Sequence, residues 1–253
     1  MTSHYRDQLF QTYHATHVAY VDHDDKTKLA WFTQYAESNY LPHLTRYDRT
    51  QAAILDVGCN KGYLLAALQG FGFKHLTGID LSPVDVEQAI QLVPNVSFVC
   101  TDAQSYLQDH IGEFDVIFIK AVLEHIAKAD VLPLLTQIKA GLKPGGTVVI
   151  DVPNMDWLFA SHERYMDFTH EVGFTKESLR QVMLNVFPQV TVIPVDSIMG
   201  LRPLEDLKKR LARYMLGKLL LWADPQGGRG PLWSRSLLAI GTKPTDSLTN
   251  VNT

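Results

Sequence analysis

Short apolar runs alternate with helix-like stretches from about residue 51 onward. The runs cover residues 53–57, 75–79, 96–100, 114–119, 147–152, 190–195 and 236–241. Helical patterns lie between them near residues 61–70, 83–92, 102–109, 129–141 and 176–186. Strands that alternate with helices are typical of a parallel sheet with crossover helices. The pattern therefore predicts an α/β protein with a seven-stranded, mostly parallel sheet and helices on both faces.

Segments outside this alternation predict additions to the sheet. Residues 1–50 lack a strand pattern and include an apolar-periodic stretch, which predicts an N-terminal helical lid. The segment 196–235 is too long for a tight hairpin, which predicts an inserted helical cap before the last strand. The core is expected at residues 51–195 and 236–244, and the polar residues 245–253 are expected to form a flexible tail.

The composition of the chain is that of a globular protein and disfavours some classes of partner and location. The 253 residues are 46% hydrophobic and 20% charged, as in ordinary globular proteins. A formal net charge of -4 argues against a phosphate-backbone binder, so no nucleic-acid partner is expected. Only Cys59 and Cys100 are present, which disfavours a disulfide framework and favours a cytoplasmic location. The N-terminus lacks a secretory signal pattern, and no apolar run reaches the roughly 18 residues that span a bilayer.

Residues 204–222 form an amphipathic and locally basic stretch. Such a stretch is typical of a helix that covers an active site or a dimer interface, so a homodimer is one interpretation. It is also typical of a helix that lies on an anionic membrane, which would place the protein peripherally at the inner face of the membrane. The sequence leaves these interpretations open.

The first predicted strand runs into the glycine turn Asp56-Val-Gly-Cys-Asn-Lys-Gly62. In parallel α/β sheets ligands bind beyond the carboxyl ends of the strands, and the first turn makes the closest backbone approach. The spacing Gly58-x-x-x-Gly62 differs from the Gly-x-Gly-x-x-Gly of dinucleotide sites. A carboxylate before the turn suits a cation better than a pyrophosphate. The turn therefore predicts a site for a cationic amino-acid tail, like that of S-adenosylmethionine.

Two further carboxylates follow the next two predicted strands. Asp80 can accept both ribose hydroxyls, and Asp102 can accept from an adenine amino group. The complete set of predicted cofactor residues is Asp56, Gly58, Cys59, Asn60, Gly62, Asp80, Leu81, Asp102, Ala103 and Lys120. The alternatives are a nicotinamide enzyme and an α/β protein without a cofactor.

Together these motifs resemble those of the class I S-adenosylmethionine-dependent methyltransferases. Residues 54–62 look like the first motif of that class, Asp80 like its ribose acid and Asp102 like its adenine-edge residue. Residues 142–147 are similar to its loop before the fifth strand. The resemblance covers about residues 51–152. It implies a Rossmann-like fold, S-adenosylmethionine as cofactor and a methyl-transfer enzyme.

Candidate catalytic side chains follow the fourth and fifth predicted strands. Glu124 and His125 emerge beside the expected methyl donor, and residues 162–175 concentrate further polar side chains, including Asp167 and His170. His170 or His125 is predicted to act as a general base, with Asp167 or Glu171 fixing its tautomer. The expected nucleophile is an oxygen atom.

The pair Glu124-His125 with the distant His170 resembles the metal site of small-RNA 2′-O-methyltransferases. That site uses a Glu-x-x-Glu-His element, whose first Glu is replaced here by Ala121. The likeness implies that Glu124, His125 and His170 bind Mg²⁺ or Mn²⁺. A divalent ion lowers the pKa of a bound hydroxyl and orients it for attack.

Residues 167–175 and 234–239 resemble methyltransferases of bacterial surface-polysaccharide and glycolipid biosynthesis. This likeness implies a sugar, glycan or glycolipid hydroxyl as the acceptor. The nearest alternative is a small aromatic or quinone-type hydroxyl, because Glu-His after the fourth strand also occurs in such enzymes. A different class, a non-catalytic S-adenosylmethionine-binding partner protein, is disfavoured by the dense polar cluster at residues 162–175.

Overall fold

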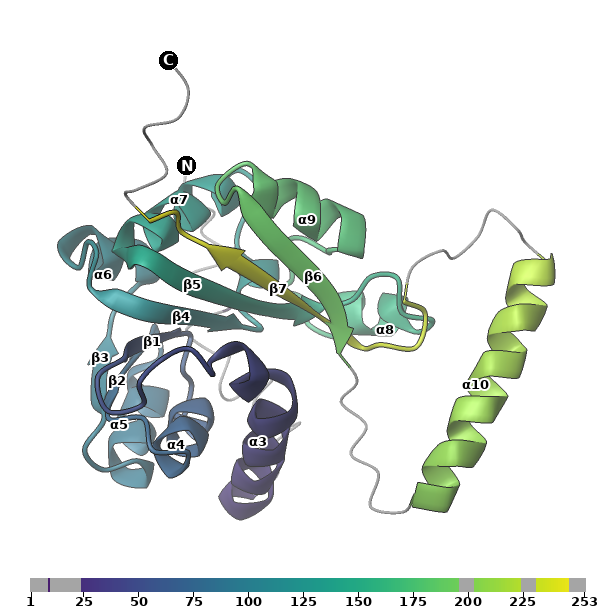
Figure 1. Cartoon of the computed structure of the whole chain (residues 1–253), viewed down its shortest axis with the longest axis horizontal. Coiled ribbons are helices and arrows are strands. Elements are labelled where there is room, and N and C mark those ends of the chain that lie inside the picture. The colour runs from purple at the N-terminus through teal and green to yellow at the C-terminus, as the bar shows by residue number, and fades with distance from the viewer. Residues whose placement is uncertain (1–8, 10–23, 196–202, 224–230, 246–253) are drawn as a thin grey trace.

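A seven-stranded sheet forms the centre of the computed structural model, which describes residues 9, 24–195, 203–223 and 231–245 (Figure 1). Its strands are β1 Ala53–Val57, β2 His75–Asp80, β3 Ser97–Cys100, β4 Phe114–Lys120, β5 Leu142–Pro153, β6 Gln189–Val195 and β7 Ser236–Thr242. They lie in the order β3-β2-β1-β4-β5-β7-β6. Strands β1 to β5 pair in parallel, whereas β7 is antiparallel to both of its neighbours. The predicted Rossmann-like, mostly parallel sheet is confirmed.

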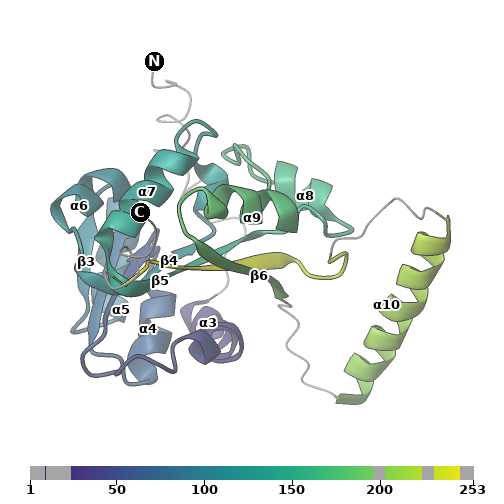
Figure 2. The same ribbon diagram turned by 45° about the horizontal axis from the view of Figure 1, so that its top comes forward.

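Helices cover both faces of this sheet (Figure 2). One face carries α3 Asp25–Asn39, α4 Tyr63–Gly70 and α5 Pro83–Leu92, and the other carries α6 Ala103–Asp109, α7 Val131–Gly141 and α9 Lys176–Leu184. The remaining described helices are η2 Leu41–His43, η3 Leu123–His125, α8 Ala160–Tyr165 and α10 Pro203–Ala223. A separate apolar cluster fills the space on each face.

The central strands are apolar without alternation because helices bury them on both sides. In β4, for example, Val116, Ile117, Phe118 and Ile119 are all at most 1% exposed. Polar side chains mark the starts of the covering helices. Ser82 caps α5, and Thr175 forms a capping box with Ser178 at the start of α9. Such caps fix where each helix begins after the turn that precedes it.

Two regions differ from the sequence expectation in detail. Strand β5 begins at Leu142 rather than near residue 147, because Leu142 pairs with Phe114 across a register shift. Residues 160–165 form the short helix α8, which includes the start of the polar cluster expected at residues 162–175. Within that cluster Phe174 is buried, whereas Tyr165 and Phe168 are exposed.

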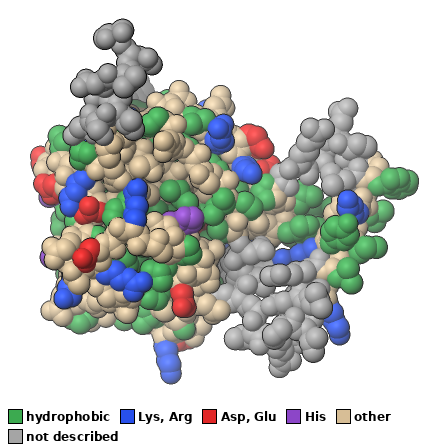
Figure 3. Space-filling view, in the orientation of Figure 1, with side chains coloured by type: hydrophobic (Ala, Val, Ile, Leu, Met, Phe, Trp, Pro, Cys, Tyr) green, Lys and Arg blue, Asp and Glu red, His purple; other side chains and the backbone are tan. Residues whose placement is uncertain are grey.

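Helix α10 stands apart from the sheet in Figures 1 and 2 and exposes Leu211, Met215, Leu219 and Trp222 (Figure 3). The inferred contact of residues 204–222 with a membrane or a second copy stays a prediction. Among the described residues no helix is both long and apolar enough to cross a membrane.

The division into lid, core, inserted cap and tail likewise stays a prediction. Helix α3 lies in the segment predicted as a lid, and α10 lies in the segment predicted as a cap. The rest of that cap at residues 196–202 and 224–230 and the tail at residues 246–253 lie outside the described residues.

Candidate functional site

The turn after β1 has the backbone conformation that its glycines predict. Gly58 and Gly62 have φ angles of +74° and +78°, a region that side chains with a Cβ rarely adopt. A Cβ on Gly58 would stand 2.2 Å from Cγ2 of Val122. The turn therefore packs directly against the segment that follows β4.

Asp56 is buried beneath this turn, where it is 3% exposed. Burial raises the pKa of its carboxyl to about 8; nearby Asp80 adds to the shift and Lys120 opposes it. The cysteine of the turn, Cys59, is also buried, and burial raises the pKa of its thiol. Asp56 is thus a carboxyl group whose charged form is costly without a cation beside it, as expected of a group that meets a ligand's ammonium.

The raised pKa gives Asp56 a measurable effect on stability. The folded protein keeps a proton on Asp56 that the unfolded chain releases above about pH 4. The stabilisation that this proton gives to the folded state is therefore complete below about pH 4, falls as the pH rises and is lost above about pH 8. The Asp56→Asn variant cannot ionise. The free energy of unfolding of the variant minus that of the wild type should therefore increase by at least about 1 kcal/mol between pH 5 and pH 8.5, which corresponds to roughly 2–4 °C in Tm. Thermal unfolding at both pH values measures this, and an equal shift at the two would contradict the assignment.

Asp80 and Asp102 occupy the ends of the next two strands, as predicted. Asp80 accepts from the backbone N–H groups of Asn60 at 2.8 Å and Ser82 at 2.9 Å, and burial raises the pKa of its carboxyl. Asp102 is exposed and caps α6 by accepting from the N–H of Ser105 at 2.9 Å; the Ser105 bond lowers the pKa of its carboxyl. Asp80 thus ties the glycine turn to β2. Asp102 already has a structural role as a cap.

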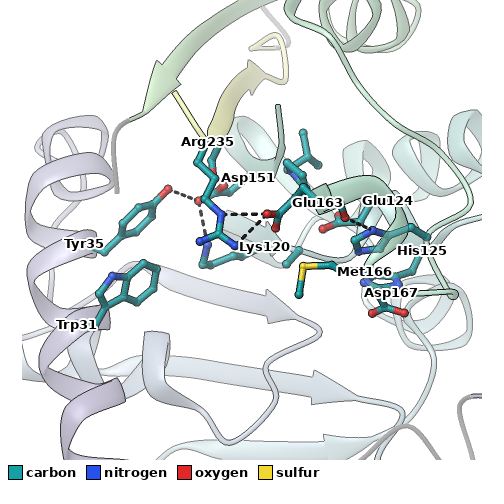
Figure 4. Close-up of a pocket in the computed structure, with 15 residues that line it drawn as sticks. Trp31, Tyr35, Lys120, Glu124, His125, Asp151, Glu163, Met166, Asp167 and Arg235 are labelled. Carbon is teal, nitrogen blue, oxygen red and sulfur yellow. Dashed lines mark hydrogen bonds and ion pairs between the residues drawn. The ribbon is translucent and has the colours of Figure 1, made fainter. Parts of the chain in front are cut away.

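A cavity of about 480 Å³ opens at the carboxyl edge of β4 and β5 (Figure 4). Its lining residues include Trp31, Tyr35, Lys120, Ala121, Glu124, His125, Asp151, Glu163, Met166, Asp167, His170 and Arg235. Helix α3 contributes an aromatic wall, formed by Trp31 and Tyr35. The polar residues come from the ends of β4 and β5, from the region of α8 and from the residue just before β7. Segments more than 200 residues apart in sequence meet here.

Lys120 and Asp151 form a polar pair on the side of the cavity that faces α3. Asp151 Oδ2 accepts from the hydroxyls of Tyr35 at 2.7 Å and Tyr40 at 2.5 Å and pairs with Lys120 Nζ at 3.2 Å. Burial and the charge of Asp151 raise the pKa of both phenols. The ammonium of Lys120 also lies 5.6 Å from the centre of the Trp31 ring. This network fixes the aromatic wall against the sheet.

Glu124, His125 and His170 come together on the opposite side of the cavity. One potential ligand atom from each of them lies within 4.8 Å of the others. The two imidazole rings have centroids 4.7 Å apart. Glu124 is 3% exposed, and burial raises the pKa of its carboxyl to about 8. Its Oε2 atom has no hydrogen-bond partner among the described residues.

Backbone and side-chain partners orient both rings. Asp167 Oδ1 accepts from Thr169 Oγ1 at 2.6 Å, so Thr169 Oγ1 accepts from His125 Nδ1 at 2.8 Å. The carbonyl of Glu163 accepts from His170 Nδ1 at 3.0 Å. In both rings Nδ1 therefore carries the proton and Nε2 carries the lone pair. The structure thus brings the three predicted catalytic residues together, with Asp167 acting on His125 through Thr169.

Sequence reasoning missed several of these residues. Thr169, which links Asp167 to His125, has no motif of its own, although its Asp-x-Thr spacing is a recognisable side-chain turn. Tyr35, Asp151 and Arg235 were also not predicted, since their roles depend on contacts between distant elements. Arg235 pairs with Glu163 at 2.9 Å across the mouth of the cavity.

Sheet order, glycine turn and strand-end carboxylates define this protein as an S-adenosylmethionine-dependent methyltransferase. The chain belongs to the family described as Methyltransferase domain, whose model matches residues 23–194. The class I prediction, the S-adenosylmethionine prediction and the enzyme prediction are therefore confirmed, and the nicotinamide and non-catalytic alternatives are set aside. The predicted binding of Mg²⁺ or Mn²⁺ stays a prediction.

Known proteins share the fold over most of the chain and the sequence over less than half of it. A SAM dependent methyltransferase from Archaeoglobus fulgidus superposes with a TM-score of 0.65 at 19% identity, covering 85% of this chain and 94% of that one. A tRNA U34 carboxymethyltransferase from Nautilia profundicola is 34% identical over 44% of this chain and 36% of its own length. A ubiquinone biosynthesis O-methyltransferase from Thiobacillus denitrificans is 32% identical over 44% and 48%. The chain thus matches less than half the length of either curated relative.

These relatives correct two expectations. The predicted sugar, glycan or glycolipid acceptor is wrong, because the curated relatives are named for tRNA and ubiquinone. The prediction of no nucleic-acid partner is contradicted by the same tRNA enzymes. The physical reason is that a net charge of -4 describes the whole chain, whereas an acceptor meets only the surface around one cavity. The loop at residues 167–175 carried the sugar resemblance, and in the structure it orients histidines instead.

Proposed function

We propose that this enzyme transfers a methyl group to a hydroxyl of a small aromatic or quinone-type acceptor bound in the cavity. The observation that carries this proposal is the cluster of Glu124, His125 and His170 in that cavity. A volume of about 480 Å³ lies within the roughly 300–1,000 Å³ typical of small-molecule sites. The ring of Trp31 supplies a flat apolar surface for an aromatic acceptor. The name of the Thiobacillus denitrificans relative supports the same acceptor class.

The cofactor-binding set is proposed as the sequence predicts it. The positive φ angles at Gly58 and Gly62 support a tight turn at the cofactor, and the buried carboxyl of Asp56 is assigned to a ligand ammonium group. Asp80, at the end of β2, is assigned to the ribose hydroxyls, and Asp102 is assigned to the adenine edge. Lys120, predicted at the methionine end, lies in the cavity paired with Asp151.

The cofactor supplies a methyl group on a sulfonium sulfur. Proton removal from the acceptor hydroxyl is assigned to His125 or His170, whose Nδ1 atoms donate to Thr169 and to the carbonyl of Glu163 and so leave Nε2 as the basic atom of each ring. With the cofactor bound, the deprotonated oxygen would take the methyl group and the cofactor would be left as a thioether. The chain's own contribution is to orient the oxygen and to receive its proton.

A nucleoside of a tRNA is the second candidate acceptor, favoured by the names of the Nautilia profundicola and Campylobacter curvus relatives. An enzyme that modifies a base takes that base out of the stack and into a pocket. The cavity would then hold one nucleobase while the rest of the tRNA lay outside it.

Turnover with labelled S-adenosylmethionine separates the two candidates. The panel contains a monohydric phenol, a catechol and a hydroquinone for the first candidate and bulk tRNA for the second, with a hexose as a further acceptor. Label is expected in the catechol or hydroquinone product. Label in tRNA alone would move the assignment to the second candidate, and label in none despite cofactor binding would overturn both.

A further inference from the structure

Three potential ligand atoms converge at Glu124, His125 and His170 in a geometry close to that of a metal site. They lie within 4.8 Å of one another. Bonds of about 2.1 Å keep two ligands of one ion no more than about 4.2 Å apart. A shift of a few tenths of an ångström by each side chain would therefore let all three atoms bind one ion.

The buried carboxylate provides an independent observation. Oε2 of Glu124 is enclosed, with no hydrogen-bond partner among the described residues. Its side chain lines the cavity next to His125 (Figure 4), and His170 belongs to the same cluster. A buried carboxylate oxygen without a partner is costly unless a cation or a donor meets it. An ion between the three side chains would satisfy this oxygen.

Both histidines are held as metal-binding histidines usually are. Nδ1 of His170 donates to the carbonyl of Glu163, and Nδ1 of His125 donates to Thr169, which is itself held by Asp167. Ligating imidazoles commonly donate their second N–H to a carbonyl or to a group backed by a carboxylate, which fixes the ring and raises its basicity. Asp167 and Thr169 are thus positioning residues.

From these contacts we propose that Glu124, His125 and His170 form a binding site for a divalent transition-metal ion such as Mn²⁺ or Zn²⁺. Two imidazole nitrogens and one carboxylate suit these ions, whereas Mg²⁺ and Ca²⁺ require mainly oxygen ligands. Among the described residues these three side chains are the group that could hold an ion, so the protein supplies three ligands. The open positions face the cavity.

This inference rests on the proposed function in one respect, the identity of the acceptor that fills the open positions. An ion held by Glu124, His125 and His170 would lower the pKa of an acceptor hydroxyl in the cavity, such as one hydroxyl of a catechol. The proton of that hydroxyl would leave to solvent, because the two imidazoles would then serve as ligands rather than as the base.

Isothermal titration of the chelator-treated, dialysed full chain with MnCl₂, ZnCl₂ and MgCl₂ tests the site without any acceptor. One Mn²⁺ or Zn²⁺ per chain is expected, with Mg²⁺ binding at least tenfold more weakly. Glu124→Gln and His170→Ala should each weaken Mn²⁺ binding by about 100-fold, and Thr169→Val by about 10-fold through the loss of ring orientation. His162→Ala, which removes an exposed histidine outside the cluster, is the matched control and should leave binding unchanged.

Saturable binding that survives both Glu124→Gln and His170→Ala would overturn the proposal, as would the absence of binding by any of the three ions. Cofactor binding by each variant verifies its fold. If no ion binds but turnover persists and depends on His170, the proposed function stands with an imidazole base. If an ion binds but no hydroxyl acceptor is methylated, the metal site stands and the proposed function fails.

Discussion

The His170→Ala variant should lose methyl transfer by about 10²–10⁴-fold while it binds S-adenosylmethionine with unchanged affinity. His170 presents Nε2 toward the cavity because its Nδ1 donates to the carbonyl of Glu163. This ring either takes the acceptor's proton or holds the ion that lowers the acceptor's pKa, so both modes require it. Single-turnover kinetics with saturating cofactor measure the loss in kcat directly.

The control for this prediction is His162→Ala on helix α8. His162 is exposed and lies outside the cluster, so its removal should leave both kcat and cofactor affinity within about twofold of the wild type. Equal losses in the two variants, or full activity in His170→Ala, would show that the cluster does not act on the acceptor.

A second large effect is expected at the glycine turn. The Gly58→Ala variant places a Cβ 2.2 Å from Cγ2 of Val122 and forces alanine to a φ of +74°. Left-handed backbone costs about 1–2 kcal/mol for a residue with a Cβ, and overpacking adds about 1–3 kcal/mol. The free energy of unfolding should fall by at least about 2 kcal/mol, and cofactor affinity should fall at least tenfold. Urea unfolding and equilibrium dialysis give the two quantities.

Two further variants separate strain from steric clash at this position. In Gly58→Ala/Val122→Ala the clash is relieved, so part of the stability should return while the backbone strain remains. Gly70→Ala, at the end of α4 with open space around its Cβ position, should keep wild-type stability or gain slightly. A Gly58→Ala protein with wild-type stability and cofactor affinity would refute the account of the turn.

Local patterns predicted the fold well for a physical reason. Strands such as β1 and β4 are buried on both faces, so their apolar runs stand out from the helices between them. The turn at Gly58–Gly62 was predictable because its function needs backbone conformations that glycine adopts most easily. Strand-end carboxylates followed from topology, since parallel strands deliver their carboxyl ends to one edge.

The acceptor side of the site was harder to predict because it is assembled by long-range contacts. Asp151 on β5 meets two tyrosines from the α3 region, more than 100 residues earlier in the sequence. Glu163 and Arg235 form an ion pair although α9, β6 and α10 lie between them in the sequence. The sugar expectation failed at this point, because a short loop resemblance does not specify the shape of a cavity built from five distant segments.

A crystal structure with S-adenosylhomocysteine and a catechol tests the central claim most directly. The account predicts the thioether sulfur beside the Gly58 turn, and a catechol oxygen in the cavity within about 2.6–3.2 Å of His170 Nε2 or bonded to an ion held by it. A cofactor bound away from the turn, or an acceptor oxygen remote from Glu124, His125 and His170, would contradict the account.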